Sequence, residues 1–297
     1  MITKMNTFQE YREIINKKLE LLFEKKVPIN LWESMKYSVL AGGKRLRPII
    51  ILEVCNSLCG KFEHAIPTAC AVEILHTYSL IHDDLPCMDN DDFRRGKPSN
   101  HKVFGEANAV LAGDAFLMFA PQLIIEKTEG LFKERLINVL HEYTKFAGVY
   151  GLIAGQVVDI DSEKGVFENT SKEETLYFIH LNKTAALFRL AMRTGAIIAG
   201  ADTRIIEKFD KFATTFGMAF QIYDDIMDEI SSFEEMGKTI GKDKNAGKLT
   251  YVSLYGLENA KKKFNENIKI CYDIINNYDS KIIKEILDKL SKRINGV

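Results

Sequence analysis

Acidic residues gather at two places in the chain, and the first group comes directly after an apolar stretch. This group is Asp83, Asp84 and Asp89, and two arginines, Arg94 and Arg95, follow it closely. Carboxylates beside apolar residues are costly to bury unless cations neutralise them, so the group predicts a site for a hard divalent metal. Arginine binds phosphate oxygens well. Acids, a metal and arginines in one short stretch therefore indicate a phosphate or diphosphate ligand that Mg²⁺ bridges to the protein.

The second acidic group contains Asp224, Asp225 and Asp228. In a helix Asp224 and Asp228 lie on one face, one turn apart, and Asp225 lies beside them. The spacing predicts a second acidic surface that could hold the same metal and phosphate ligands.

The first group does not fit a continuous helix. At about 100° per residue, Asp89 would lie roughly 240° around the helix from Asp83. Pro86 interrupts the helix between them and lets the chain bring Asp89 back. We therefore expect two acidic helix ends that face each other across one cavity.

A known family carries the same motifs. The chain reads Asp83-Asp84-x-x-x-x-Asp89, then Arg94-Arg95-Gly96-x-Pro98, then Asp224-Asp225-x-x-Asp228. This order resembles the trans-isoprenyl diphosphate synthases, and most closely the bacterial farnesyl diphosphate synthases, over roughly residues 38–256. The resemblance implies the isoprenoid synthase fold, a homodimer, and Mg²⁺ as cofactor. It suggests three ions, with Mn²⁺ as the alternative, held by Asp83, Asp84, Asp89, Asp224, Asp225 and Asp228.

A basic loop precedes the first acidic group. Paired glycines free the backbone at residues 42–43, three cations follow within four positions, and Pro48 can start the next helix. Basic residues at a helix N-terminus suit a diphosphate, although a solvated connection between helices would have the same composition. The resemblance assigns four residues to the diphosphate of isopentenyl diphosphate: Lys44, Arg47, His76 and Arg95.

The resemblance assigns a second set of residues to the allylic diphosphate: Arg94, Lys183, Thr184, Gln221, Lys238 and Lys248. Without it, Lys183 would be read as an exposed lysine, and Lys238 and Lys248 as solvated charges of a Gly/Lys-rich loop over residues 237–248. Gln156 and Asp159 are expected near the second metal site.

The implied reaction joins isopentenyl diphosphate head to tail to an allylic diphosphate by ionisation, condensation and elimination. The difficult step separates a negatively charged diphosphate from a carbocation, which the metal and the cations would stabilise. The residues expected to act in catalysis are Asp83, Asp84, Asp89, Arg94, Lys183, Thr184, Gln221, Asp224 and Lys238. The departing diphosphate can accept the final proton.

Two residues before the first acidic group are expected to set product length. Tyr78, five positions before Asp83, and Ser79 resemble the pattern of bacterial farnesyl synthases, whereas plastid geranylgeranyl synthases tend to carry a smaller or flexible residue in place of the tyrosine. We therefore expect a fifteen-carbon product, farnesyl diphosphate, with the twenty-carbon geranylgeranyl diphosphate as the alternative. The helical wheel places Ser79, not Tyr78, on the Asp83 face.

Two other classes of protein deserve weighing. A terpene cyclase would be expected to carry an Asn/Ser-Thr/Glu-type second motif and would not need the basic loop at residues 43–48. A non-catalytic partner subunit of a prenyl synthase would be expected to lose one or both acidic motifs. Both motifs are intact.

Composition supports one all-α domain over residues 1–297, a large helical bundle around a deep central cavity. Apolar residues recur at three- and four-residue intervals, prolines number only 6, and no linker-like tract divides the chain. The net charge of −1 gives no support to a nucleic-acid partner. Five cysteines without paired spacing, and no apolar stretch long enough for export or a membrane span, predict a cytoplasmic protein.

Overall fold

The computed structural model describes residues 7–24, 26–167, 170–230 and 248–296. The chain divides into two compact units, Met1–Leu140 with Ile198–Gly200, and His141–Ile197 with Ala201–Val297. The all-α prediction is confirmed, because the described residues form helices apart from one two-stranded hairpin. One domain over residues 1–297, built around a central cavity, stays a prediction.

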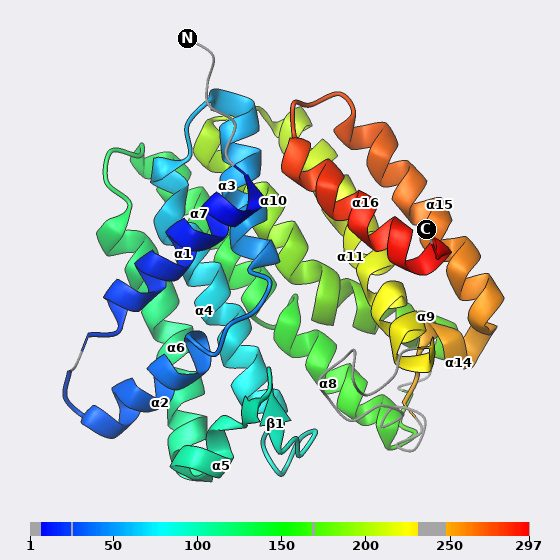
Figure 1. Cartoon of the computed structure of the whole chain (residues 1–297), viewed down its shortest axis with the longest axis horizontal. Coiled ribbons are helices and arrows are strands. Elements are labelled where there is room, and N and C mark those ends of the chain that lie inside the picture. Colours follow the sequence, from blue (N-terminus) through cyan, green and yellow to red (C-terminus); the bar gives the residue numbers. More distant parts are fainter. Residues whose placement is uncertain (1–6, 25, 168–169, 231–247, 297) are drawn as a thin grey trace. The chain divides into compact units, whose positions relative to one another are not determined.

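The first unit contains most of the N-terminal half of the chain (Figure 1). Its elements are α1 (Phe8–Leu22), α2 (Ile29–Val39), α3 (Leu46–Cys59), the 3₁₀ turn η1 (Glu63–Ala65), α4 (Ile66–Asp83), β1 (Phe93–Arg94), β2 (Lys97–Pro98), α5 (Asn100–Phe104), α6 (Glu106–Lys127) and the first half of α7 (Lys133–Ala147).

Helices α4 and α6 form the centre of the first unit. Small residues of α6, Ala109, Ala112 and Ala120, are fully buried with Phe116 between them. Small side chains let two helix backbones approach closely, which is why this pair packs along most of its length. Within the described residues, α6 is the one helix long and apolar enough to cross a membrane, and 39% of its apolar stretch is buried inside the fold.

The second unit contains the other helices. They are the second half of α7, α8 (Leu152–Glu163), α9 (Lys172–Ile179), the π-helical turn η2 (His180–Ala185), α10 (Ala186–Ala199), α11 (Thr203–Ile230), α14 (Tyr251–Tyr255), α15 (Leu257–Ile275) and α16 (Lys281–Asn295). A capping box between Ser171 and Glu174 begins α9, as the sequence predicts.

Helix α11 is the long central helix of the second unit, and α15 packs along it (Figure 1). Phe209, Phe212 and Phe216 are buried on one side of α11, and Phe216 lies against Phe188 of α10 with ring centroids 4.9 Å apart. The aromatic stripe is therefore core, as expected from its spacing. Because the aromatic stripe occupies this side of α11, the second acidic group lies on a different side of the helix.

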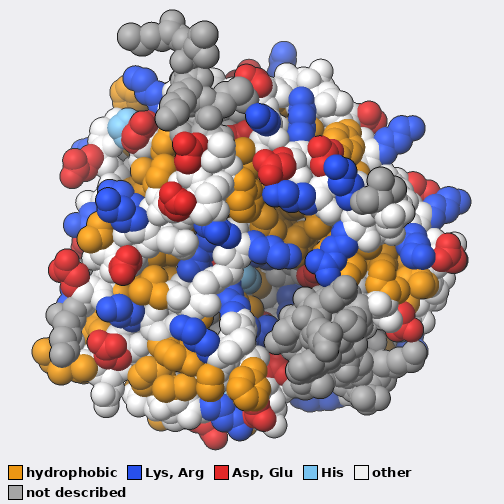
Figure 2. Space-filling view, in the orientation of Figure 1, with side chains coloured by type: hydrophobic (Ala, Val, Ile, Leu, Met, Phe, Trp, Pro, Cys, Tyr) orange, Lys and Arg blue, Asp and Glu red, His pale blue; other side chains and the backbone are white. Residues whose placement is uncertain are grey.

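The surface carries both signs of charge. On the face shown in Figure 2, lysines and arginines are interspersed with acidic and apolar side chains. The mixture agrees with the net charge of −1. All five cysteines are free thiols.

Candidate active site

The chain reverses direction directly after α4 and brings the first acidic group together. Asp83 ends the helix, and the backbone N–H of Asp89 donates to the carbonyl of Asp83 at 2.9 Å. Asn90 adopts a positive φ of 49°, which completes the turn. The backbone therefore carries Asp89 back to Asp83 as the position of Pro86 predicts, and both side chains are half-exposed.

Asp84 has a different environment from its neighbour. It is buried, and its carboxylate accepts two hydrogen bonds from Arg94, at 2.9 Å from Nε and 2.5 Å from Nη2. Burial raises the pKa of Asp84 to about 6, and the bonds from Arg94 oppose that rise. Arg94 also pairs with Asp91 at 3.1 Å. Asp84 and Arg94, predicted to hold metal and allylic diphosphate, are thus each other's partners here.

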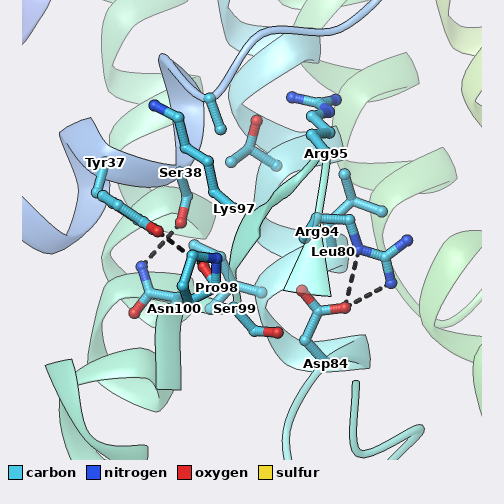
Figure 3. Close-up of a pocket in the computed structure, with 13 residues that line it drawn as sticks. Tyr37, Ser38, Leu80, Asp84, Arg94, Arg95, Lys97, Pro98, Ser99 and Asn100 are labelled. Atoms are coloured by element: carbon cyan, nitrogen blue, oxygen red, sulfur yellow. Dashed lines mark hydrogen bonds and ion pairs between the residues drawn. The ribbon is translucent and has the colours of Figure 1, made fainter. Parts of the chain in front are cut away.

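The hairpin of β1 and β2 separates the two arginines. Arg94 pairs with Lys97 across the hairpin, and the two turn residues, Arg95 and Gly96, have positive φ values of 54° and 74°. This is the backbone of a two-residue turn that suits a β-hairpin. Figure 3 shows the result, with Arg94 reaching Asp84 and Arg95 pointing away from it.

Arg95 lies against the glycine loop between α2 and α3. Its Nη1 donates to the carbonyl of Gly42 at 2.5 Å, and a Cβ added to Gly43 would lie 2.9 Å from its guanidinium carbon. Only glycine permits this contact, which explains the second glycine of the pair. A pocket opens beside the two arginines (Figure 3), and it is lined by residues of α2, α4, the hairpin and α5.

His76 lies among the arginines predicted to bind isopentenyl diphosphate. Burial lowers the pKa of His76 well below its usual value, and the charges of Arg47 and Arg95 lower it further. The structure thus brings three of the four predicted residues together. Lys44, the fourth predicted residue, is exposed on the basic loop between α2 and α3.

Arg45 turns inward, unlike the two cations that flank it. Its Nη1 lies 2.6 Å from Glu73 of α4, its Nη2 donates to the carbonyl of Val39 at 2.7 Å, and its Nε donates to Asn16 at 3.0 Å. Arg45 and Glu73 are both buried. Through these contacts Arg45 holds the basic loop against α1, α2 and α4. The sequence pattern alone does not indicate the buried pair of Arg45 and Glu73.

The second unit holds a chain of hydrogen bonds that ends at the second acidic group. Thr184 donates to Gln221 at 2.5 Å, and Gln221 donates to Asp225 at 3.0 Å. The backbone N–H of Tyr251 also donates to Asp225, at 2.7 Å. Three of the predicted site residues are therefore joined. They fix the π-helical turn to α11, and π-helical turns are frequent at functional sites.

The members of the second acidic group differ in burial as those of the first group do. Asp225 is buried and its oxygens accept the bonds from Gln221 and Tyr251. Asp224 and Asp228 are half-exposed. One buried and two half-exposed carboxylates thus occur in each acidic group.

The lysines predicted to bind allylic diphosphate converge on one acid. Lys183 Nζ lies 2.5 Å from Asp159 Oδ2, and Lys248 Nζ lies 3.9 Å from the same oxygen and 3.7 Å from Glu163. Asp159, which is expected near a metal, pairs with these lysines. Lys238 lies outside the described residues.

The two residues predicted to set chain length lie on α4. Tyr78 is 8% exposed, and its ring meets that of His82 edge to face at 4.9 Å. His82 in turn contacts α6, where its Nε2 lies 3.1 Å from the carbonyl of Val110, over the space left by Gly113. Ser79 donates to the carbonyl of His76 at 2.9 Å.

His180 predicts a stability change with pH. Burial lowers its pKa to about 4, although Asp159 opposes the shift. The unfolded chain binds a proton near pH 6.5, so it takes up more protons than the native state between about pH 6.5 and 4, and stability falls there. From pH 7 to 5 we expect His180 alone to lower the free energy of unfolding by about 2 kcal/mol.

Urea unfolding of the wild type and of His180→Asn at both pH values measures this contribution. Asp84 acts in the opposite direction, because its raised pKa makes protonation stabilise the native state. The difference in pH slope between the two proteins removes the contribution of Asp84. Equal slopes would contradict the assignment to His180.

Known proteins are similar to this chain in sequence and in fold. Residues 28–290 match the polyprenyl synthetase family. The chain is 51% identical over 247 residues to a chloroplastic geranylgeranyl pyrophosphate synthase of Catharanthus roseus, covering 83% of this chain and 68% of that protein. It is 47% identical over 277 residues to the large subunit 1 of a heterodimeric geranylgeranyl pyrophosphate synthase of Arabidopsis thaliana, covering 93% and 74%. The cytoplasmic location is not confirmed, because both relatives are named chloroplastic.

Among solved structures, an FPP/GFPP synthase from Zymomonas mobilis superimposes with a TM-score of 0.84 at 30% identity, covering 95% of this chain and 97% of that chain. This likeness confirms the predicted all-α isoprenoid synthase fold. The acidic motifs, the helical fold and the sequence match agree, and the chain belongs to the polyprenyl synthetase family and is a trans-prenyltransferase.

Proposed function

We propose that this protein lengthens an allylic diphosphate with isopentenyl diphosphate and releases mainly the twenty-carbon product, geranylgeranyl diphosphate. The names of the relatives at 51% and 47% identity support the twenty-carbon product over the fifteen-carbon product expected from Tyr78. The observation that carries the reaction class is a group of buried or half-buried cations in each unit, beside half-exposed acids.

In the first unit, Arg47, His76 and Arg95 would bind the diphosphate of isopentenyl diphosphate, with Lys44 at the exposed edge. Arg95 suits this role because the hairpin turn and Gly43 hold its guanidinium in one place. His76 would donate hydrogen bonds to an anion, and a bound diphosphate would raise its pKa.

In the second unit, Lys183 and Lys248 would bind the allylic diphosphate, together with the Thr184 and Gln221 pair. The other members of the predicted set are Arg94, which belongs to the first unit, and Lys238, which lies outside the described residues. Lysine charges stabilise the negative charge that grows on the diphosphate as the allylic C–O bond breaks. The diphosphate then accepts the proton lost in the elimination step, so no side chain is required as the base.

The half-exposed acids fit Mg²⁺ by their chemistry. Asp83 and Asp89 in one group, and Asp224 and Asp228 in the other, present carboxylate oxygens, the ligands that Mg²⁺ prefers. Asp84 and Asp225 are buried, and their oxygens accept hydrogen bonds from Arg94, Gln221 and the backbone N–H of Tyr251. Bound Mg²⁺ would stabilise charge on the leaving diphosphate.

A fifteen-carbon product is the second candidate, and one observation favours it. Tyr78 is buried on α4, five positions before Asp83, and its ring meets that of His82 edge to face. A fixed aromatic ring near the reacting end would limit how far a growing chain extends. The FPP/GFPP synthase similar to this chain is named for fifteen- and twenty-five-carbon products.

Product length decides between the two candidates. The purified protein would be incubated with dimethylallyl diphosphate, isopentenyl diphosphate and Mg²⁺, and the dephosphorylated alcohols separated by chromatography. A dominant twenty-carbon alcohol supports the proposal, and a fifteen-carbon alcohol supports the second candidate. No elongated product would contradict both and would favour a partner subunit.

Tyr78→Ala tests the role of the aromatic ring. We expect the mean product to lengthen by at least one five-carbon unit, because removing a buried ring opens space comparable to an isoprene group. Tyr37→Ala, a tyrosine in the pocket beside the hairpin, is the matched control and should leave product length unchanged. An unchanged product in Tyr78→Ala would reject its role as the stop.

We also propose that the protein is a homodimer that uses α6. Leu111, Met118 and Ile125 are exposed at seven-residue spacing and form one apolar stripe along the helix. A second copy of this chain would bury the stripe, because the same surface is present on both copies.

Light scattering after gel filtration tests this interface. Wild type should elute as a dimer, and Met118→Glu should shift at least half of it to monomer, because a charge would be buried in an apolar contact. Phe132→Glu is the control, since Phe132 has the same 73% exposure outside α6. A monomeric wild type would reject the homodimer and leave a different subunit, as in the heterodimeric relative, to be sought.

A further inference from the structure

Asp159 is a buried acid that none of the proposed metal sites includes. It lies on α8 and is 3% exposed. Its Oδ2 contacts Lys183 at 2.5 Å and lies 3.9 Å from Lys248. One carboxylate thus meets two lysines that the proposed function places at the allylic diphosphate.

The position of Asp159 follows from its own helix. Gly155 and Asp159 are one turn apart and share a face of α8. A Cβ on Gly155 would lie 2.2 Å from the backbone nitrogen of Lys183, so only glycine lets α8 touch the π-helical turn there. The contact between Gly155 and the backbone of Lys183 brings the Asp159 carboxylate beside the Lys183 side chain. The spacing of the glycine and the acid on α8 therefore sets where the Lys183 ammonium lies.

The two lysines depend on Asp159 to different degrees. Lys183 is only 21% exposed and makes the shorter contact with Asp159. If Lys183 moved away, the buried carboxylate of Asp159 would lose its closest cation, which is costly. The Lys183 ammonium has three N–H groups and can bind a diphosphate without releasing the acid. Lys248 is farther from Asp159 and is shared with Glu163, so Asp159 holds it less tightly than it holds Lys183.

Two lysines supply positive charge close to Asp159. Lys183 and Lys248 both lie within 4 Å of its Oδ2. His180 Nε2 lies 3.7 Å from a different acid, Asp225.

We propose that Asp159 is a positioning residue that holds Lys183 in place for the allylic diphosphate and gives Lys248 a resting partner until that substrate binds. The inference rests on the proposed function, because the roles of the two lysines come from it. It predicts an effect on one substrate only.

Steady-state kinetics of Asp159→Asn test the proposal. We expect KM for the allylic diphosphate to rise about 10-fold and kcat to fall about 10-fold, while KM for isopentenyl diphosphate changes less than 2-fold. Asp159→Glu should recover part of the allylic KM, because it restores the charge. Asp161→Asn, an acid on the same helix whose position is about 200° away, is the control and should match wild type.

A double variant tests whether Asp159 acts through Lys183. Added to Lys183→Met, Asp159→Asn should cost less than 3-fold in kcat/KM, because the residue it positions is already gone. Full additivity would overturn the proposal, as would an unchanged allylic KM in an active, folded Asp159→Asn.

If wild type makes no elongated product, the proposed function fails. If wild type makes the elongated product and Asp159→Asn has the same kinetics as wild type, the inference about Asp159 fails and the proposed function stands. A thermal melt of each variant identifies loss of fold, and in that case Asp159→Glu decides.

Discussion

Replacing Asp89 by Asn is expected to lower kcat by about 10³-fold, the effect of removing one group that stabilises charge in a transition state. The substitution keeps the shape of the side chain and removes its charge. The turn itself depends on the backbone N–H of Asp89, which the asparagine retains. The apparent affinity for Mg²⁺ should fall as well, because a carboxylate ligand is lost.

Activity measured over a range of Mg²⁺ concentrations checks this prediction. Asp92→Asn is the matched control, since Asp92 lies three residues away and its side chain makes an exposed pair with Lys102 at 2.7 Å. Such surface pairs contribute about 0–1 kcal/mol, so the control should keep its activity and its Mg²⁺ requirement. If Asp89→Asn kept more than a tenth of wild-type kcat, the first acidic group would not be the metal site.

Much of the candidate site could be predicted because its signals are local. Helices follow from apolar spacing, and the return of Asp89 follows from Pro86. The divergence of the two arginines needs only two positive φ values, which Gly96 makes easy and Arg95 tolerates. These features depend on a few neighbouring residues, so the sequence contains enough to identify them.

Burial separates residues that the sequence presents as equivalent. Asp83 and Asp84 are adjacent and chemically identical, yet one is half-exposed and the other is buried against Arg94. The same holds for Asp224 and Asp225. Which acid turns inward depends in part on partners 10 or more positions away, such as Arg94 for Asp84 and Tyr251 for Asp225, and no local pattern reports these partners.

The contacts of Asp159 with Lys183 and Lys248 also could not be predicted from local sequence. Twenty-four positions separate Asp159 from Lys183, and 89 separate it from Lys248. The glycine one turn before Asp159 was visible in the sequence, but its use became clear only from the contact between α8 and the π-helical turn.

Arg45→Met is expected to lower the free energy of unfolding by about 3–5 kcal/mol, because it leaves the charge of Glu73 buried without its closest partner. Both side chains of this pair are 2% exposed. Arg95 lies 3.7 Å from Glu73 and would be drawn toward it, away from the isopentenyl diphosphate site. The variant should therefore also raise KM for that substrate. Urea unfolding and substrate titration measure the two effects separately.

Lys44→Met is the control that separates loop anchoring from ligand binding. Lys44 is exposed beside Arg45, so its loss should raise KM for isopentenyl diphosphate with a stability change below about 0.5 kcal/mol. Arg45→Met combined with Glu73→Met should regain most of the lost stability, since apolar side chains can replace a buried pair. A loss below 1 kcal/mol in Arg45→Met would mean that Arg95 already neutralises Glu73, and that the inward turn of Arg45 stabilises little.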